Sequence, residues 1–189
     1  KMQSRFHPAM KVEEELYGDA ILTALPHRVC KAGALPTLSI PGLEPRGALW
    51  LELDAPGGGT LQLINTHLGL VPREQRLQAA HLLGPGWVGG AKRRGATMLI
   101  GDFNAPPASS VYRMCRARLE DAQMRLRRAF NTLPTFPSAF PVLRIDHAFV
   151  SPEIRVRDVC VENGPLAKRA SDHLPLIVDF DLAGGASGA

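Results

Sequence analysis

The sequence predicts a mixed α/β or α+β domain with a β-sheet at its centre. Two strand-like runs, 46–54 and 60–68, are joined by the turn-rich segment 55–59, and this pattern predicts a hairpin. The runs 61–64 and 98–100 are apolar on both alternating faces, which is typical of strands that are covered on both sides. Helical segments alternate with further strands, so sheet and helices are expected to pack as layers.

The elements are expected in the following order. Strands are predicted at 17–25, 46–54, 60–68, 97–100, 145–150, 155–161 and 174–180. One helix is predicted at 72–83, where Pro72 opens it and Leu77, Ala80 and Leu83 form an apolar stripe. A second, arginine-rich helical region is predicted at 109–128. Residues 1–16 show no clear period, and the segments 84–95 and 133–142 are expected to be loops.

Composition favours one globular domain over residues 1–189, with 183–189 as a frayed Gly/Ala/Ser tail. The chain is 45% hydrophobic and 21% charged, which is ordinary for a soluble protein and not for a disordered one. No apolar stretch is long enough to span a bilayer, and no signal-peptide pattern opens the chain. The three scattered cysteines do not predict a disulfide framework, so a cytoplasmic location is expected.

Four short polar clusters lie where predicted strands begin or end. They are Asn-Thr-His at 65–67, Gly-Asp-Phe-Asn at 101–104, Arg-Ile-Asp-His at 144–147 and Ser-Asp-His at 171–173. Burying such side chains without partners costs roughly a few kcal/mol each, so their positions indicate a polar pocket at one sheet edge. Asp102 and Asp172 are candidates to hold a divalent cation, and His67 and His173 are candidates to contact a phosphate. This inventory predicts metal-assisted cleavage of a phosphoester.

Each cluster taken alone has a simpler interpretation. A histidine at a strand end is usually structural, and Asp followed by Asn in a loop often caps a turn. The functional interpretation depends on four clusters occurring in one short chain. His7, His27, His81 and His147 lack that context, and structural or solvent-exposed roles are expected for them.

The ordered motifs resemble those of the endonuclease/exonuclease/phosphatase superfamily, the DNase I-like fold. The similarity covers 65–68, 101–104, 145–151 and 171–175, and the strand 17–22 resembles a Gly-Asn-Ala-Ile-Leu strand of the family, with Asp19 in place of Asn. Residues 135–141 are similar to a segment of uncharacterised bacterial members. The resemblance implies a four-layer α/β/β/α sandwich, bound Mg²⁺ or Mn²⁺, and in-line attack of water on a phosphodiester or phosphomonoester.

The resemblance also assigns roles to individual residues. Asp102 would orient or deprotonate the attacking water, and Asn104 would hold that water or a phosphate oxygen. His173, held by Asp146, would contact the phosphate and stabilise its charge, and His67 would act from the other side. The metal would be bound by Asp102, Asn104 and Asp172. A carboxylate behind a histidine fixes its tautomer and favours its protonated form, in agreement with these roles.

One departure from the family pattern concerns the beginning of the chain. Family members begin with a strand that carries Asn, a helix, and a strand ending in Gln-Glu, whose glutamate is the main metal ligand. Nothing before Tyr17 fits, and the acidic run 13–15 is expected to be solvated. The sandwich is therefore expected to be incomplete at its N-terminus, with weak metal affinity unless a complementing N-terminal segment supplies the remainder.

Two functions follow from the sequence. The first is a divalent-metal-dependent phosphoesterase acting on nucleic acid, a phospholipid head group or a small phosphorylated molecule. The alternative is a catalytically impaired or non-catalytic fragment of the same fold that binds a partner or a phosphate-bearing ligand. The formal charge of +4 and the arginines of 113–128 are compatible with a polyanion, but solvated arginines on helices are the commoner explanation.

Overall fold

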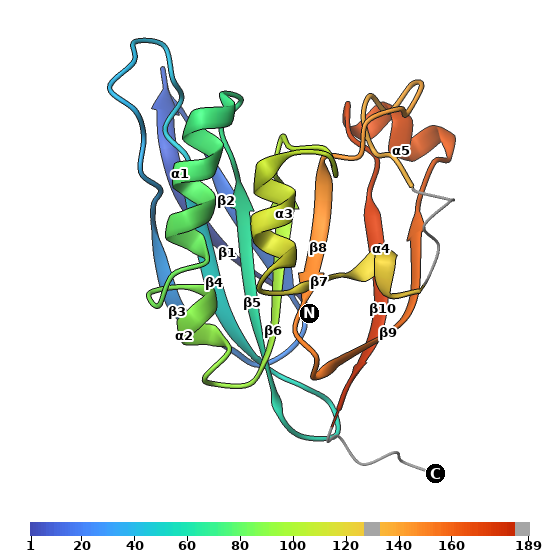
Figure 1. Ribbon diagram of the computed structural model, residues 1–189. Helices are drawn as coiled ribbons and strands as arrows, with labels where there is room; N and C mark the ends of the chain where they lie inside the picture. The colour runs from blue at the N-terminus through green and yellow to red at the C-terminus, as the bar shows by residue number, and fades with distance from the viewer. Residues whose placement is uncertain (127–132, 184–189) are drawn as a thin grey trace.

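The computed structural model describes residues 1–126 and 133–183, and a six-stranded sheet forms its centre (Figure 1). The strand order is β3-β4-β5-β6-β8-β7. Its members are β3 (His27–Ala34), β4 (Gly47–Asp54), β5 (Thr60–His67), β6 (Ala96–Asp102), β7 (Glu120–Asp121) and β8 (Asp146–Val150). Strands β5 and β6 are parallel, whereas β8 runs antiparallel to β6. The predicted mixed α/β fold with a central sheet is confirmed.

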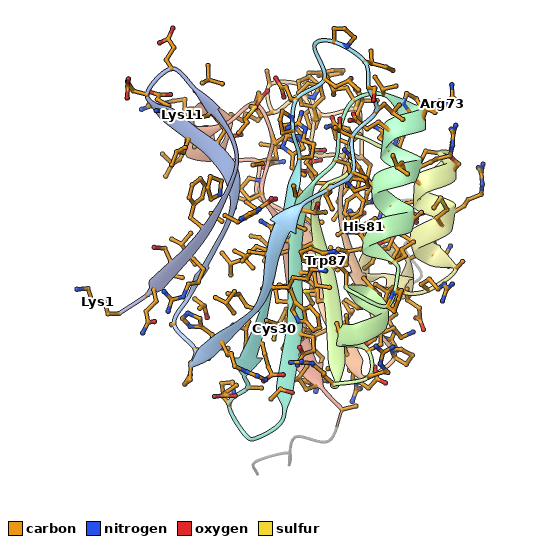
Figure 2. The ribbon with its side chains drawn as sticks, turned by 90° about the vertical axis from the view of Figure 1, so that its left-hand side faces the viewer. Lys1, Lys11, Cys30, Arg73, His81 and Trp87 are labelled. Atoms are coloured by element: carbon orange, nitrogen blue, oxygen red, sulfur yellow. The ribbon has the colours of Figure 1, made fainter. Side chains whose placement is uncertain are left out.

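Two further pairs of strands lie outside this sheet. The antiparallel hairpin of β1 (Gln3–Val12) and β2 (Glu15–Thr23) contacts β4, and β2 also contacts β5. Strand β10 (Leu176–Leu182) pairs with β9 (Ile154–Val161) and contacts β8. Figure 2 shows the hairpin, with Lys11 near its turn, as a layer on the side of the sheet opposite to the helix that carries His81.

The helices cover the other face of the large sheet. They are α1 (Pro72–Leu82), α2 (Val88–Ala91) and α3 (Ser110–Arg116), while α4 (Ala122–Arg125) follows β7 and α5 (Pro165–Ala170) lies beside the upper ends of β9 and β10 in Figure 1. Among the described residues, none of these helices is both long and apolar enough to cross a membrane.

Two apolar clusters hold the layers together. One lies between the helices and the sheet and includes Trp87, Leu82 and Phe149, and the other lies between the sheet and the outer strands and includes Leu51, Met98 and Val159. Burying a side chain of this size stabilises the fold by roughly 1.5–3 kcal/mol. The sheet is thus covered on both faces, as the apolar runs 61–64 and 98–100 predict.

The structure corrects several predicted elements. Residues 1–16 are not irregular, because β1 and the start of β2 occupy them, although Glu13 and Glu14 are exposed in the turn as expected. Strand β3 and helices α2 and α5 were not predicted. The helical region 109–128 is shorter than predicted, since α3 ends at Arg116 and β7 and α4 follow, while 127–128 lie outside the described residues. The single-domain boundary 1–189 stays a prediction.

Candidate active site

Three of the predicted residues lie in one row across three neighbouring strands. His67 ends β5 opposite Asp102 at the end of β6, and Asp102 lies opposite Asp146 at the start of β8. Because β5 and β6 are parallel, their carboxyl ends reach the same edge of the sheet. The sheet register therefore brings these three side chains together at this edge.

The backbone between these strands has an unusual geometry. A Cβ atom on Gly101 would lie 1.8 Å from the Thr66 carbonyl oxygen, and the Gly101 φ angle is 140°. Three residues later, Asn104 adopts a φ of 48°, a left-handed conformation that Asn tolerates better than most residues. Its backbone N–H donates to Oδ1 of Asp102 at 2.8 Å. This turn holds the Asp102 carboxylate in place.

Asp102 and Asp146 form a group with His173 that could hold a metal ion. One ligand atom from each residue lies within 4.8 Å of the others. Nδ1 of His173 lies 2.8 Å from Oδ2 of Asp146, and its Nε2 lies 3.9 Å from Oδ2 of Asp102. Thr135 donates a hydrogen bond to the same Asp146 oxygen. These contacts connect β6, β8 and the segment before β10 at one point.

His67 lies on the other side of Asp102. Its Nε2 is 3.3 Å from Oδ2 of Asp102 and 3.2 Å from Nδ2 of Asn104, and its Nδ1 is 3.2 Å from Nη1 of Arg46. A guanidinium can only donate hydrogen bonds, so Nδ1 accepts from Arg46 and the ring proton of neutral His67 is on Nε2, facing Asp102. Asn104 also donates to the Leu68 carbonyl at 2.9 Å, which fixes its side chain.

The charges of this group alter its proton affinities. For Asp102, burial acts to raise the carboxyl pKa, but the hydrogen bonds from His67 and from the Asn104 N–H outweigh it, and the pKa lies below the ordinary value. Burial raises the pKa of Asp146, against the hydrogen bonds of Thr135 and His173. Burial acts to lower the pKa of His173, but its bond to Asp146 and the nearby carboxylates raise it above the ordinary value.

Asp172 lies directly before His173, in the segment that leads to β10. It is exposed, it does not belong to the group of three, and its side chain accepts a long contact of 3.5 Å from the Ser171 hydroxyl. Its backbone carbonyl accepts a hydrogen bond from Ser138. The assignment of Asp172 and Asn104 as metal ligands stays a prediction.

Two residues of the site were missed by the sequence analysis. Arg46 contacts His67, and Thr135 supports Asp146. Arg46 is a charged residue directly before the apolar run 47–51 of β4, which is the same signal that identified the four clusters. Thr135 lies in a segment that was predicted only as loop, so nothing in its immediate sequence indicated this contact.

His147 lies outside the site and has a structural role. His147 follows Asp146 but is fully buried against Phe103, Tyr112 and Phe149, and its Nε2 lies 2.8 Å from the Ala105 carbonyl oxygen. Burial lowers the pKa of His147 to about 4. The imidazole is therefore neutral near pH 7 and is a core residue.

The sequence profile of the Endonuclease/Exonuclease/phosphatase family matches residues 5–173. The uncharacterized protein YbhP of Escherichia coli K12 is 28% identical over 149 residues, which cover 77% of this chain and 56% of YbhP, so the chain spans about half the length of this curated relative.

Two solved structures show the same fold. An endonuclease/exonuclease/phosphatase from Bacteroides vulgatus superposes with a TM-score of 0.73 at 18% identity, over 96% of this chain and 76% of that one. The mannosyl-6-phosphatase Bt3783 of Bacteroides thetaiotaomicron superposes with a TM-score of 0.72 at 18% identity, over 96% and 77%. Since the family profile covers most of the sequence and the fold agrees, the chain belongs to the endonuclease/exonuclease/phosphatase family.

Proposed function

We propose that the protein is a divalent-metal-dependent phosphoesterase that hydrolyses a phosphodiester or phosphomonoester by in-line attack of water. The observation that carries this proposal is the row of His67, Asp102 and Asp146 with His173 beside it, at one edge of the sheet. Acidic oxygens and imidazole nitrogens that converge in this way suit a cation and a phosphate together.

The donor set fits Mg²⁺ or Mn²⁺. A hard divalent cation prefers carboxylate oxygens, so Asp102 and Asp146 are suited to hold it, together with Asn104 and Asp172 as the sequence predicts. When bound, such an ion would polarise a phosphoryl oxygen and neutralise negative charge. His173, with its raised pKa, is better suited to donate a hydrogen bond to the phosphate than to bind a metal.

The remaining roles follow from the contacts. Asp102 accepts hydrogen bonds and remains ionised, so it can orient a water or take its proton. Asp146 holds the His173 imidazole and supports its charged form. With Nδ1 accepting from Arg46, the ring proton of His67 is on Nε2 and faces Asp102, where it can also donate to a phosphate oxygen.

The substrate is proposed to be a phosphoester, and the basic residues give little support to nucleic acid. Arg113 donates to the Ala108 carbonyl at 2.7 Å, Arg125 pairs with Glu120 at 3.0 Å, and Lys92 donates to the Arg118 carbonyl at 2.9 Å. These side chains are engaged within the protein. The mannosyl-6-phosphatase that shares the fold favours a small phosphorylated molecule as the first substrate to test.

The non-catalytic alternative is less well supported. A domain that only binds a partner has no need for an ionised Asp102, an Asp146–His173 pair and an oriented His67 at one edge. A cytoplasmic location and a complementing N-terminal segment remain part of the proposal. An apolar groove of about 520 Å³, lined by residues such as Leu63, Ile100 and Val178, reaches Asp102 and Asp146.

The test is a substrate panel of supercoiled DNA, phospholipids and phosphomonoesters with Mg²⁺ or Mn²⁺. Turnover is expected to disappear in chelator and to fall by about 10³-fold or more in Asp102→Ala and His173→Ala. His81→Ala is the matched control, because His81 is exposed on α1 and outside the site. Turnover that persists in chelator, or in either active-site variant, would contradict the mechanism.

A further inference from the structure

A second pocket lies next to the candidate active site, on the opposite side of His67 from Asp102. It has a volume of about 370 Å³ and is lined by residues of the β1–β2 hairpin and of the segment before β4, among them Met10, Tyr17, Asp19, Pro45, Arg46 and His67. His67 is shared by both sites, since its Nε2 faces Asp102 and its Nδ1 faces Arg46. A molecule with its phosphate at His67 could therefore extend into this pocket.

Two charged residues of the pocket are largely withdrawn from solvent. Asp19 is 4% exposed, and the Arg46 side chain is 11% exposed. Nη2 of Arg46 pairs with Glu44 at 2.8 Å, but its buried Nε has no hydrogen-bond partner within residues 1–126 and 133–183. Burial raises the pKa of the Asp19 carboxyl to about 7, against the charge of Arg46. A buried charged or polar group without a full set of partners destabilises the folded state. Proteins typically keep such groups at sites that bind a ligand.

The backbone makes room for Asp19. A Cβ atom on Gly47 would lie 2.9 Å from Oδ2 of Asp19 and 3.0 Å from Cδ2 of His7, so a glycine at this position lets both side chains lie against β4. Nε2 of His7 is buried and also lacks a partner among the described residues. His7 does not line the pocket itself, whose charged and polar lining comes from Asp19, Glu44, Arg46 and His67.

We propose that this pocket is the subsite for the non-phosphate part of the substrate and that it binds a hydroxylated group, such as a sugar or another polyol. Arg46 supplies donors and Asp19 supplies an acceptor, and hydroxyl groups satisfy both because they donate and accept. The Tyr17 ring, Met10 and Pro45 offer apolar surface to the carbon-bound hydrogens of a sugar. The pocket volume is in the range of small-molecule sites.

Other ligand classes fit less well. A second anionic group would meet the carboxyl groups of Asp19 and Glu44 beside Arg46. An acyl chain would leave the polar atoms of Asp19 and Arg46 without partners. This inference rests on the proposed phosphoesterase function, because it assumes that the phosphate of the same molecule lies at His67 and His173.

The test uses the full chain with ¹³C-methyl-labelled methionine, in chelator, so that binding is read without turnover. Met10 lines this pocket, whereas Met98 lines the apolar groove and serves as an internal reference. Titration with glucose 6-phosphate is expected to shift the Met10 methyl signal saturably and to leave the Met98 signal unchanged. Inorganic phosphate and free glucose are titrated in parallel, to separate the contributions of the two parts of the molecule.

Variants then test the two polar residues. Asp19→Ala and Arg46→Met are expected to weaken glucose 6-phosphate binding at least tenfold, with partial recovery in Arg46→Lys. The matched controls Asp54→Ala and Arg28→Met change exposed residues of the same types on β4 and β3 and should stay within twofold.

The outcomes separate this inference from the proposed function. Binding or hydrolysis of phosphoesters with an unmoved Met10 signal and unchanged affinities in the Asp19 and Arg46 variants overturns the subsite alone. If no phosphoester is hydrolysed with any metal, the proposed function fails. The titration with free glucose then tests separately whether the pocket binds a polyol. A Met10 shift then supports a polyol site, and no shift overturns it.

Discussion

Nδ1 of His173 lies 2.8 Å from Oδ2 of Asp146, and this pair joins the segment before β10 to the first residue of β8. The same Asp146 oxygen accepts a hydrogen bond from Thr135. Thr135 thus holds the Asp146 carboxylate, and the carboxylate holds the His173 imidazole. In this orientation Nε2 of His173 faces Asp102.

Asp146→Asn is expected to lower the pKa of His173. Burial lowers this pKa, but the bond to Asp146 and the surrounding carboxylates hold it above the ordinary value. A histidine whose pKa is higher in the folded state than in the unfolded state stabilises the fold at pH values below its unfolded-state pKa. This contribution is lost as the pH rises through its folded-state pKa. NMR titration of the His173 ring should show the midpoint moving to lower pH in the variant, and the basic limb of kcat/KM should move with it. An unchanged midpoint would mean that Asp146 does not support the imidazolium.

Asn104→Gly and Asn104→Ala are expected to reduce activity alike but to differ in stability. Both remove the side chain that contacts His67 and the Leu68 carbonyl, so kcat/KM should fall by about 10²-fold or more in each. Only glycine accepts the φ of 48° without strain, so alanine should cost about 1 kcal/mol more in urea unfolding. Equal stability of the two variants would show that the turn relaxes.

Gly101→Ala is expected to destabilise the protein by about 3 kcal/mol or to prevent folding. Its Cβ would lie 1.8 Å from the Thr66 carbonyl oxygen, which belongs to the backbone of β5 and cannot move away freely. Gly58→Ala is the matched control, because Gly58 also has a positive φ of 97° but nothing lies within 4 Å of its Cβ position. The control should cost about 1 kcal/mol, measured by denaturant unfolding. Similar losses in both variants would contradict the close approach of β5 and β6.

Asp19→Asn is expected to stabilise the protein at pH 8 by about 2 kcal/mol. The rise of the Asp19 pKa by about three pH units corresponds to roughly 4 kcal/mol, but the gain is smaller because the new amide also needs hydrogen-bond partners. Burial raises the pKa of Asp19 to about 7 from 3.8, so the wild type loses stability as pH rises between these values, whereas Asn does not titrate. Unfolding in urea at pH 8 and at pH 4 should show the difference shrinking at low pH. A variant that is no more stable than the wild type at pH 8 would show that the folded protein already accommodates the carboxylate.

His147→Phe is expected to make the protein less sensitive to acid. The pKa of His147 falls from 6.5 to about 4 on burial, so the unfolded chain binds a proton first, and stability is lost as pH falls from 6.5 toward 4. This loss amounts to about 3 kcal/mol at most. The variant gives up the contact with the Ala105 carbonyl but should show a shallower decline of unfolding free energy over this range. Parallel pH profiles would assign the acid sensitivity to other groups.

The central sheet and the position of the site follow from sequence because local pattern and tertiary packing agree there. The apolar runs 61–64 and 98–100 are followed by His67 and Asp102, and the parallel register of β5 and β6 places these ends side by side. The polar clusters had already pointed to Asp146 and His173, and the family resemblance added their pairing. Their contact joins segments 27 residues apart and could not be derived from either segment alone.

The elements that sequence reasoning missed depend on tertiary contacts. Strand β1 is mostly exposed, so its residues show no clear apolar alternation. The helix predicted for 109–128 ends early because Tyr112 and Arg144 both bind the buried Asp121 carboxylate, which ties β7 to the sheet. The Arg46–His67 contact joins the residue before β4 to the last residue of β5, and it became visible only once the pairing of these strands was known.

The two outer strand pairs have a consequence for how the protein behaves in solution. Within residues 1–126 and 133–183, β1 and β2 pair only with each other, as do β9 and β10, so each pair presents backbone donors and acceptors along its outer sides. Phe6, Leu16 and Leu22 are exposed on the first of them. Unprotected edges of this kind recruit strands from neighbouring molecules. Self-association should therefore rise with protein concentration. If a different chain pairs with these edges instead of further copies of this one, the protein should stay unassociated.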